Sequence, residues 1–190
     1  MGTLVFFAVL AAVAFWLVGA YNKLVSLKNQ VVNAWKQIDV QLKRRHDLIP
    51  NLVNTVKGAM DFEKSALEAV INARSRAMGA HGVKETAQAE GMLTQALGRL
   101  FALAEAYPDL KATGNIAQLQ EELTSTENKI AFARQLYNDT STQYNTAQQQ
   151  FPTNLVAGLA KAAPADLWEI EDPAERAVPR VDLGGHPPAA

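Results

Sequence analysis

The chain has 190 residues, and its 18 Lys and Arg against 19 Asp and Glu leave a formal net charge of −1. It therefore lacks the basic excess typical of nucleic-acid-binding proteins, and we expect no nucleic-acid partner. The absence of cysteine excludes disulfides, Cys-ligated zinc and thiol nucleophiles. Glycine is scarce and six of the eight prolines lie beyond residue 150, a composition that favours an all-α fold.

Residues 3–20 form an uncharged, strongly apolar segment. As a helix, this segment spans about 27 Å, which is close to the hydrocarbon thickness of a bilayer. Trp16 and Tyr21 lie near its C-terminal end, and Lys23 follows, as expected for side chains at a membrane interface. We therefore predict a single-pass transmembrane anchor over residues 1–20.

The basic residues near this segment all follow it in the sequence. They are Lys23, Lys28, Lys36, Lys43, Arg44 and Arg45. The positive-inside rule then places the N-terminus outside the cell and the rest of the chain in the cytoplasm. The alternative is a signal peptide cleaved near Ala20, although the basic n-region of such peptides is missing here.

Apolar residues recur at helical spacing in four segments after the anchor. These are approximately residues 21–46, 47–78, 83–107 and 115–151. The expected inward-facing residues include Leu24, Val31, Ile38 and Leu42; Leu52, Met60, Val70 and Ile71; Leu93, Leu100 and Tyr107; and Ile116, Thr126, Tyr137, Tyr144 and Phe151. The last segment keeps its 3-4 spacing over five heptads. The predicted fold is a transmembrane helix continuous with an elongated antiparallel four-helix bundle, residues 21–160.

Pro50 determines where the first bundle helix is expected to end. Proline cannot donate a hydrogen bond to the carbonyl of His46, and it disfavours helical geometry at Ile49. We therefore predict a tight turn near Asp47, which places residues 43–47 at the tip of the bundle far from the membrane. The alternative is one long helix that is kinked at Pro50.

Residues 161–190 are rich in proline and lack a helical period. We expect a mostly extended or disordered tail, in which Trp168 and Val181 are the residues able to dock on the bundle. The apolar stretch over residues 155–163 predicts one or two turns of helix before the tail. The loop at residues 79–82 and the tail are expected on the membrane side of the bundle.

Lys43, Arg44, Arg45 and His46 form the densest cationic cluster, and they are the candidate partner-binding residues. They suit an acidic partner or an anionic lipid; the alternative is a helix C-terminus stabilised by ion pairs with acids at the same tip. The three histidines are scattered and no catalytic motif is present, so we expect no metal, no cofactor and no enzymatic activity.

The stretch AWKQIDVQLKRRHDLIPNLVNTVKG, residues 34–58, resembles the signature of the LemA family. The similarity continues through the Ala73-Arg74 pair, ARQLYND at 133–139, QYN at 143–145 and FPTN at 151–154. The resemblance implies one N-terminal membrane helix followed by an elongated helical bundle, in the bacterial inner (cytoplasmic) membrane, and it supplies no catalytic residues. A magnetosome membrane protein is similar to the same family, which implies a role in membrane shaping or scaffolding.

These observations predict a non-enzymatic, membrane-anchored scaffold or interaction protein involved in membrane organisation or remodelling. Its expected partners are the lipid bilayer and further copies of the same chain. The alternative function is that of an adaptor for another membrane protein, such as a protease or a signalling complex.

Overall fold

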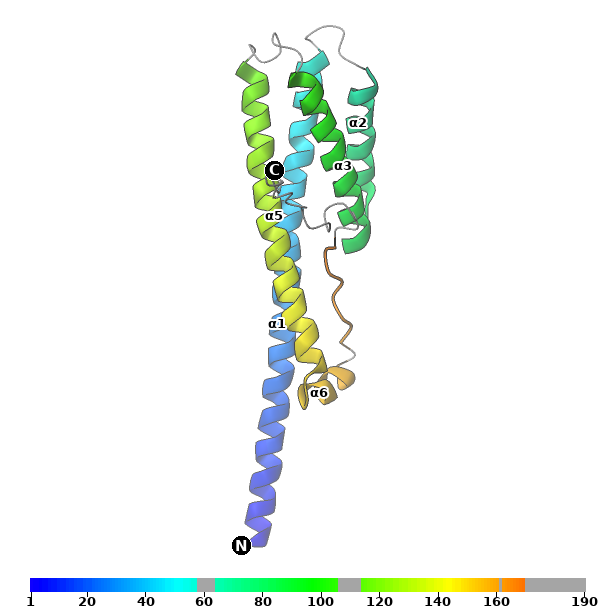
Figure 1. The fold of residues 1–190 in the computed structure, drawn as a ribbon. Coiled ribbons are helices and arrows are strands. Elements are labelled where there is room, and N and C mark those ends of the chain that lie inside the picture. Colours follow the sequence, from blue (N-terminus) through cyan, green and yellow to red (C-terminus); the bar gives the residue numbers. More distant parts are fainter. Residues whose placement is uncertain (58–63, 106–113, 161, 170–190) are drawn as a thin grey trace, which may run out of the picture.

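The computed structural model describes residues 1–57, 64–105, 114–160 and 162–169. Within these ranges the regular structure is helical. The helices are α1 (Gly2–Lys57), α2 (Lys64–Gly79), α3 (Gly82–Glu105), α5 (Gly114–Gln149) and α6 (Thr153–Leu159). In Figure 1, α1 runs the length of an elongated molecule, α5 lies along it, and α2 and α3 stand beside the half that is far from the N-terminus. The predictions of an all-α fold and a helical bundle are confirmed.

The first turns of α1 project beyond the rest of the molecule. Phe15 is 81% exposed, whereas packing against other helices begins near Leu24, which is 3% exposed. In the part of the chain that the structure describes, α1 is the one helix long and apolar enough to cross a membrane, with a mean hydropathy of 2.4 over 18 residues. The apolar segment and the first packed helix are one continuous element, as expected (Figure 1).

The predicted turn near Asp47 is wrong, because α1 continues through Pro50 to Lys57. Pro50 does leave the carbonyl of His46 without its usual helical donor. However, Nε of Arg74 on α2 donates a hydrogen bond to this carbonyl oxygen at 2.8 Å. A side chain from the neighbouring helix thus replaces the missing backbone bond, and the helix passes the proline without ending.

Residues 43–47 consequently lie inside a helix and not at a tip. Lys43, Arg44 and Asp47 point outward, whereas Arg45 and His46 are buried against the other helices. The far end of the molecule is formed where α1 ends and α5 begins (Figure 1). The other segment expected at this tip, residues 108–114, lies almost wholly outside the described residues.

The half of the molecule far from the N-terminus contains a core to which α1, α2, α3 and α5 all contribute. We call it the distal core, and its most deeply buried members are Ile49, Leu52, Val56, Val70, Leu93 and Leu100. A turn from Gly79 to Gly82 joins α2 to α3, and the positive φ of Gly82, 76°, suits a residue without a Cβ. This turn lies beside the middle of α5, so its expected place at the membrane end is wrong (Figure 1).

A second cluster, the proximal core, lies nearer the N-terminal end of α1. Its members are Leu24, Val31, Ala34, Ile38 and Leu42 of α1, Ala87 of α3, Ile130, Ala133, Tyr137, Tyr144 and Ala147 of α5, Val156 and Ala157 of α6, and Trp168. Here α1 and α5 are covered mainly by α6 and by residues 162–169, which run back along them without helical structure (Figure 1). The short helix and the docking of Trp168 are both confirmed.

Most of the expected inward-facing residues are buried, but Ile71 and Phe151 are not, at 43% and 80% exposed. Ile71 follows the fully buried Val70, and adjacent residues of a helix point about 100° apart. Phe151 lies beyond the end of α5, where the helical period no longer applies. Met60, Tyr107 and Val181 lie outside the described residues.

Candidate functional site

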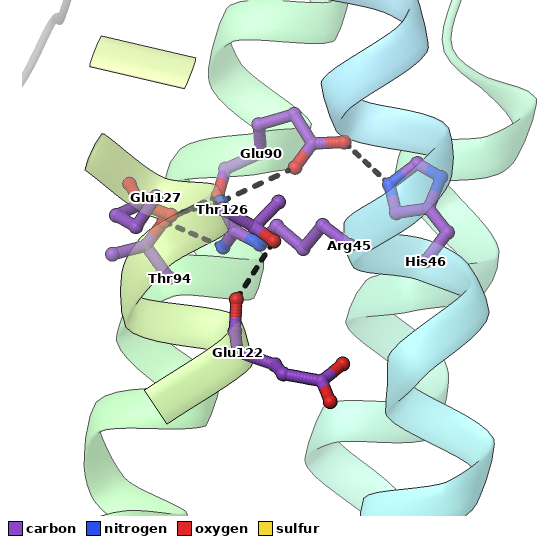
Figure 2. A network of polar contacts seen from close by, with 7 residues as sticks. All are labelled: Arg45, His46, Glu90, Thr94, Glu122, Thr126 and Glu127. Carbon is purple, nitrogen blue, oxygen red and sulfur yellow. Dashed lines mark hydrogen bonds and ion pairs between the residues drawn. The ribbon is translucent and has the colours of Figure 1, made fainter. Parts of the chain in front are cut away.

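A network of charged and polar side chains lies inside the bundle, between α1, α3 and α5 (Figure 2). Its centre is Arg45, which is only 2% exposed. Nη1 of Arg45 donates to Oε2 of Glu127 at 2.7 Å, and Nη2 donates to Oγ1 of Thr94 at 2.7 Å. Oε2 of Glu90 lies 3.6 Å from the same Nη1. One guanidinium therefore joins three helices.

His46, the next residue of α1, extends this network to a second contact with Glu90. Its Nε2 lies 2.6 Å from Oε1 of Glu90. The imidazole and the carboxylate are therefore in direct hydrogen-bond contact. Nε of Arg45 and Oε2 of Glu90 have no hydrogen-bond partner, which leaves the network incompletely satisfied.

This arrangement is suited to holding helices in register. Within the described residues, no group of three or more His, Cys, Asp or Glu could hold a metal ion. Arg45 and Glu90 are buried on helices whose neighbours cover them, and removing Arg45 would take from Glu90 and Glu127 the one guanidinium that both contact. The contacts of Arg45 and His46 therefore account for the inner half of the cationic cluster.

The remaining predicted site residues are accessible. Lys43 and Arg44 face outward beside the buried pair. Trp16, Tyr21 and Lys23 are also exposed, at the point where the apolar end of α1 gives way to packed helix. Their assignments to a partner and to a membrane interface stay predictions.

Sequence reasoning missed a site on α5 that holds the segment after α6. The side chain of Asn145 accepts from the backbone N–H of Ala165 at 2.8 Å and donates to the carbonyl of the same residue at 2.9 Å. Asn138 makes the same pair of bonds with Trp168, at 2.8 and 3.0 Å. We call these two residues the asparagine clamp. The only sequence signal is two asparagines seven residues apart, on one face of the helix.

Trp168 is held by a set of ring contacts as well as by the clamp. Its ring centroid lies 6.0 Å from that of Trp35 on α1, and the guanidinium carbon of Arg134 lies 5.2 Å from the Trp168 centroid. Tyr137 packs edge-on against Trp35, and its hydroxyl donates to the carbonyl of Asp166 at 2.8 Å. Burial raises the pKa of Tyr137 above its ordinary value, and the Asp166 carboxylate adds to the rise.

A groove of about 1250 Å³ runs along a face made by α1 and α5. Three large apolar side chains with substantial exposure line it, Val40, Phe132 and Leu136. Lys36 and Asp139 also line it. An apolar surface with a charged rim is typical of a protein contact site.

The model of the LemA family matches residues 34–183. This match covers most of the bundle and much of the following segment. The chain belongs to the LemA family.

Relatives of this LemA-family chain come from several bacteria. Protein LemA of Metamycoplasma hominis is 28% identical over 168 residues, which cover 87% of this chain and 74% of that protein. Magnetosome protein MamQ 2 of Paramagnetospirillum magneticum is 25% identical over 195 residues, covering 88% and 71%. Magnetosome protein MamQ of Magnetospirillum gryphiswaldense is 27% identical over 178 residues, covering 79% and 65%.

The LemA-like stretches of the sequence fall on the two sites described above. Residues 34–58 contribute Trp35, Arg45 and His46, and the Ala73-Arg74 pair supplies the donor that compensates for Pro50. The stretches at 133–139 and 143–145 contain Asn138 and Asn145. The motifs that carry the family resemblance therefore supply Arg45 and His46 of the buried network and both residues of the asparagine clamp.

Proposed function

We propose that this protein is a non-enzymatic, membrane-anchored scaffold that associates with further copies of itself and organises the membrane that holds it. The observation that carries this proposal is the apolar beginning of α1, whose side chains no other part of the described chain covers. Eighteen uncharged residues in water expose enough apolar surface that insertion into a bilayer is strongly favoured. A magnetosome protein among the relatives supports a membrane role.

The proposed location is the bacterial inner membrane, with the N-terminus outside and the bundle, as an antiparallel four-helix unit, in the cytoplasm. Lys23, Lys28 and Lys36 are exposed just after the apolar turns, and none of their kind precedes them. These charges favour the cytoplasmic side. Trp16 and Tyr21 then lie at the interface with the lipid headgroups.

The groove with Val40, Phe132 and Leu136 is the proposed contact between copies. Because every copy holds this groove at the same height above its anchor, two copies in one membrane can meet through it. The aromatic ring of Phe132, at 80% exposed, is the natural anchor of such a contact.

Cross-linking in native membranes tests this proposal. We expect the protein in the membrane fraction, with lysine cross-linking giving dimers and larger species. Phe132→Ser should greatly reduce the cross-linked species, whereas Phe151→Ser should not, because Phe151 is equally exposed but lies away from the groove. A chain that floats free of membranes, or equal cross-linking of both variants, would contradict the anchor or the contact, respectively.

A second candidate is an adaptor that binds an acidic segment of another membrane protein. The exposed, adjacent cations Lys43 and Arg44 favour it. Replacing both with Glu should abolish co-purification of the partner, whereas the same change at Lys28 should not. Retention of every co-purified protein by the double variant would count against this surface.

A further inference from the structure

The segment 162–169 is held largely through its backbone. Each residue of the asparagine clamp bonds to both the N–H and the C=O of one residue, Asn145 to Ala165 and Asn138 to Trp168. These four bonds do not involve the side chains of the segment. The clamp therefore reads an extended main chain, in the way that the edge of a β-sheet does.

The spacing of the clamp matches the spacing of an extended chain. Seven residues of helix separate Asn138 from Asn145, a rise of about 10.5 Å. Three residues of extended chain, from 165 to 168, span about 10 Å. The helix thus presents two main-chain binding points at the repeat of an extended peptide, running antiparallel to α5.

Two positions add selectivity to this backbone contact. The indole of Trp168 is 4% exposed and lies against Trp35 and under Arg134. Ala165 is half-buried against the proximal core, where a small side chain fits. A ligand therefore needs a small residue, two residues of free choice, and then tryptophan.

We propose that the surface formed by the asparagine clamp, Trp35 and Arg134, which we call the clamp site, is a binding site for extended peptides of that kind, and that it accepts residues 162–169 of a second copy of the chain as well as its own. In the structure the copy's own segment is the ligand. The clamp does not distinguish that segment from the identical one on a neighbour. The exchange rests on the proposed membrane anchoring, which holds the clamp sites and the 162–169 segments of neighbouring copies at one height.

Binding in cis has the advantage of proximity. Asn145 and Ala165 are 20 residues apart in the chain, with α6 between them, and a segment joined over so short a stretch acts at an effective concentration in the millimolar range. A free peptide competes poorly with it, and copies crowded in one membrane compete much better. Exchange therefore increases with the surface density of the protein, which gives the scaffold a density-dependent link between copies.

A peptide-binding experiment tests the clamp site without the membrane. The full-length Trp168→Pro variant in detergent loses the indole and the N–H of residue 168 but keeps every residue of the clamp site. We expect fluorescence anisotropy to show saturable binding of a fluorescent peptide of residues 162–169 to this variant. The same peptide should bind the unaltered chain at least about tenfold more weakly, because the chain's own segment already occupies the clamp site. The Ala165→Pro peptide lacks the backbone N–H that donates to Oδ1 of Asn145, so it should bind about tenfold more weakly than the unaltered peptide.

Circular dichroism shows whether the helices of the variant are intact, and Trp168→Ala replaces it if they are not. Absence of saturable binding to a helical variant would overturn the peptide site. So would equal binding of the Ala165→Pro peptide.

A cross-linking experiment tests exchange between copies. Lys84 of α3 contacts the bound segment, since its Nζ lies 3.4 Å from Oδ1 of Asp166, and both side chains are exposed. Because the chain has no cysteine, Lys84→Cys in one copy and Asp166→Cys in another give single reactive positions. In vesicles holding equal amounts of both copies, a short bis-maleimide should give clearly more than twice as much mixed dimer as either homodimer, because random encounters alone already give twice as much.

Adding Asn138→Leu and Asn145→Leu to the Lys84→Cys copy should abolish the excess of mixed dimer, while lysine cross-linking through the Phe132 groove continues. Mixed dimers at no more than twice the amount of either homodimer would overturn exchange. Loss of all cross-linking in both experiments would instead contradict self-association itself.

Discussion

The distal and proximal cores are closed in different ways. In the distal core, two helices, α2 and α3, cover α1 and α5, and buried apolar side chains make most of the contact, beside the polar contacts of Arg45 and Arg74. In the proximal core, a non-helical segment covers the same two helices, and two asparagines hold its backbone. A helix satisfies its own backbone groups, so it can be bound by side chains alone. An extended segment has to have its backbone groups satisfied by the surface that it covers.

The buried network at Arg45 lies where α1, α3 and α5 meet, and its loss should have the largest effect. Arg45→Ala leaves Glu90 buried with His46 as its remaining partner and removes the contacts to Glu127 and Thr94, so we expect the free energy of unfolding to fall by about 3–5 kcal/mol. The exposed neighbour Arg44 is the matched control, and Arg44→Ala should change stability by less than about 0.5 kcal/mol. Chemical unfolding of the detergent-solubilised protein, followed by circular dichroism, measures both. Similar losses would show that the network adds nothing.

A cavity in the distal core should weaken the whole bundle, and one in the proximal core should act locally. Leu93→Ala removes a fully buried side chain, and a loss of about 2–5 kcal/mol is expected in global unfolding. Trp168→Ala should instead speed amide exchange in residues 162–169 and leave α2 and α3 protected. Hydrogen exchange read by mass spectrometry distinguishes the two patterns. Uniform loss of protection in Trp168→Ala would remove the distinction between the cores.

The hydrogen bond from Arg74 to the carbonyl of His46 tests why α1 continues past Pro50. Arg74→Leu leaves this carbonyl without a donor and should cost about 1–3 kcal/mol. Pro50→Ala restores a backbone donor, so Arg74→Leu should cost much less in the Pro50→Ala background. A double-mutant cycle in urea gives the coupling directly. An equal cost in both backgrounds would mean that Arg74 acts through other contacts.

Tyr137 makes the proximal core sensitive to alkaline pH. Its pKa is raised above 10.0, so the folded state holds the phenolic proton more tightly than the unfolded state does. The resulting stabilisation is complete below pH 10 and is lost as the pH rises through the raised value. We expect Tyr137→Phe to be slightly less stable at neutral pH but to lose less stability above pH 10 than the unaltered chain. Tyr21→Phe, outside both cores, is the control; parallel alkaline curves for Tyr137→Phe and the unaltered chain would refute this role.

The ion pair of Lys84 with Asp166 should have the smallest effect of the contacts that hold the segment. Both groups are exposed, so solvent and salt screen them. Lys84→Ala should lower stability by at most about 1 kcal/mol, with no measurable effect at high salt. Thermal unfolding at low and high ionic strength checks this, and a larger, salt-independent loss would indicate that the segment depends on this pair.

The sequence predicts the parts of the fold that depend on side-chain periodicity. The 3-4 spacing in α5 places Thr126, Tyr137 and Tyr144 correctly in the core. The uncharged, apolar segment of residues 3–20 forms the exposed beginning of α1, as its composition predicts. Periodicity within one helix carries no information on what a distant helix supplies. The predicted turn near Asp47 is wrong for this reason, since the donor that compensates for Pro50 is Arg74, 24 residues further along the chain.

The candidate sites show the same limit. The cationic cluster at 43–46 was recognisable, but a local pattern could not divide it into an outward pair and an inward pair, because Glu90 and Glu127 lie far away in sequence. The asparagine clamp was missed because its contacts are with backbone groups, and a backbone partner leaves no mark on residue type. Proline at 165 or 168 is incompatible with the clamp, but only the structure shows that the N–H groups of these two residues are used.

The uninterrupted course of α1 has a mechanical consequence. Its 56 residues make a rod of about 84 Å, and the bond from Arg74 keeps that rod stiff at the proline where it could otherwise flex. A tilt of only about 10° at the lipid-facing end sweeps the opposite end sideways by about 15 Å. For a membrane-anchored rod, changes of bilayer thickness or curvature would thus be magnified into displacements as wide as a neighbouring helix pair at the end of α1 far from the apolar turns.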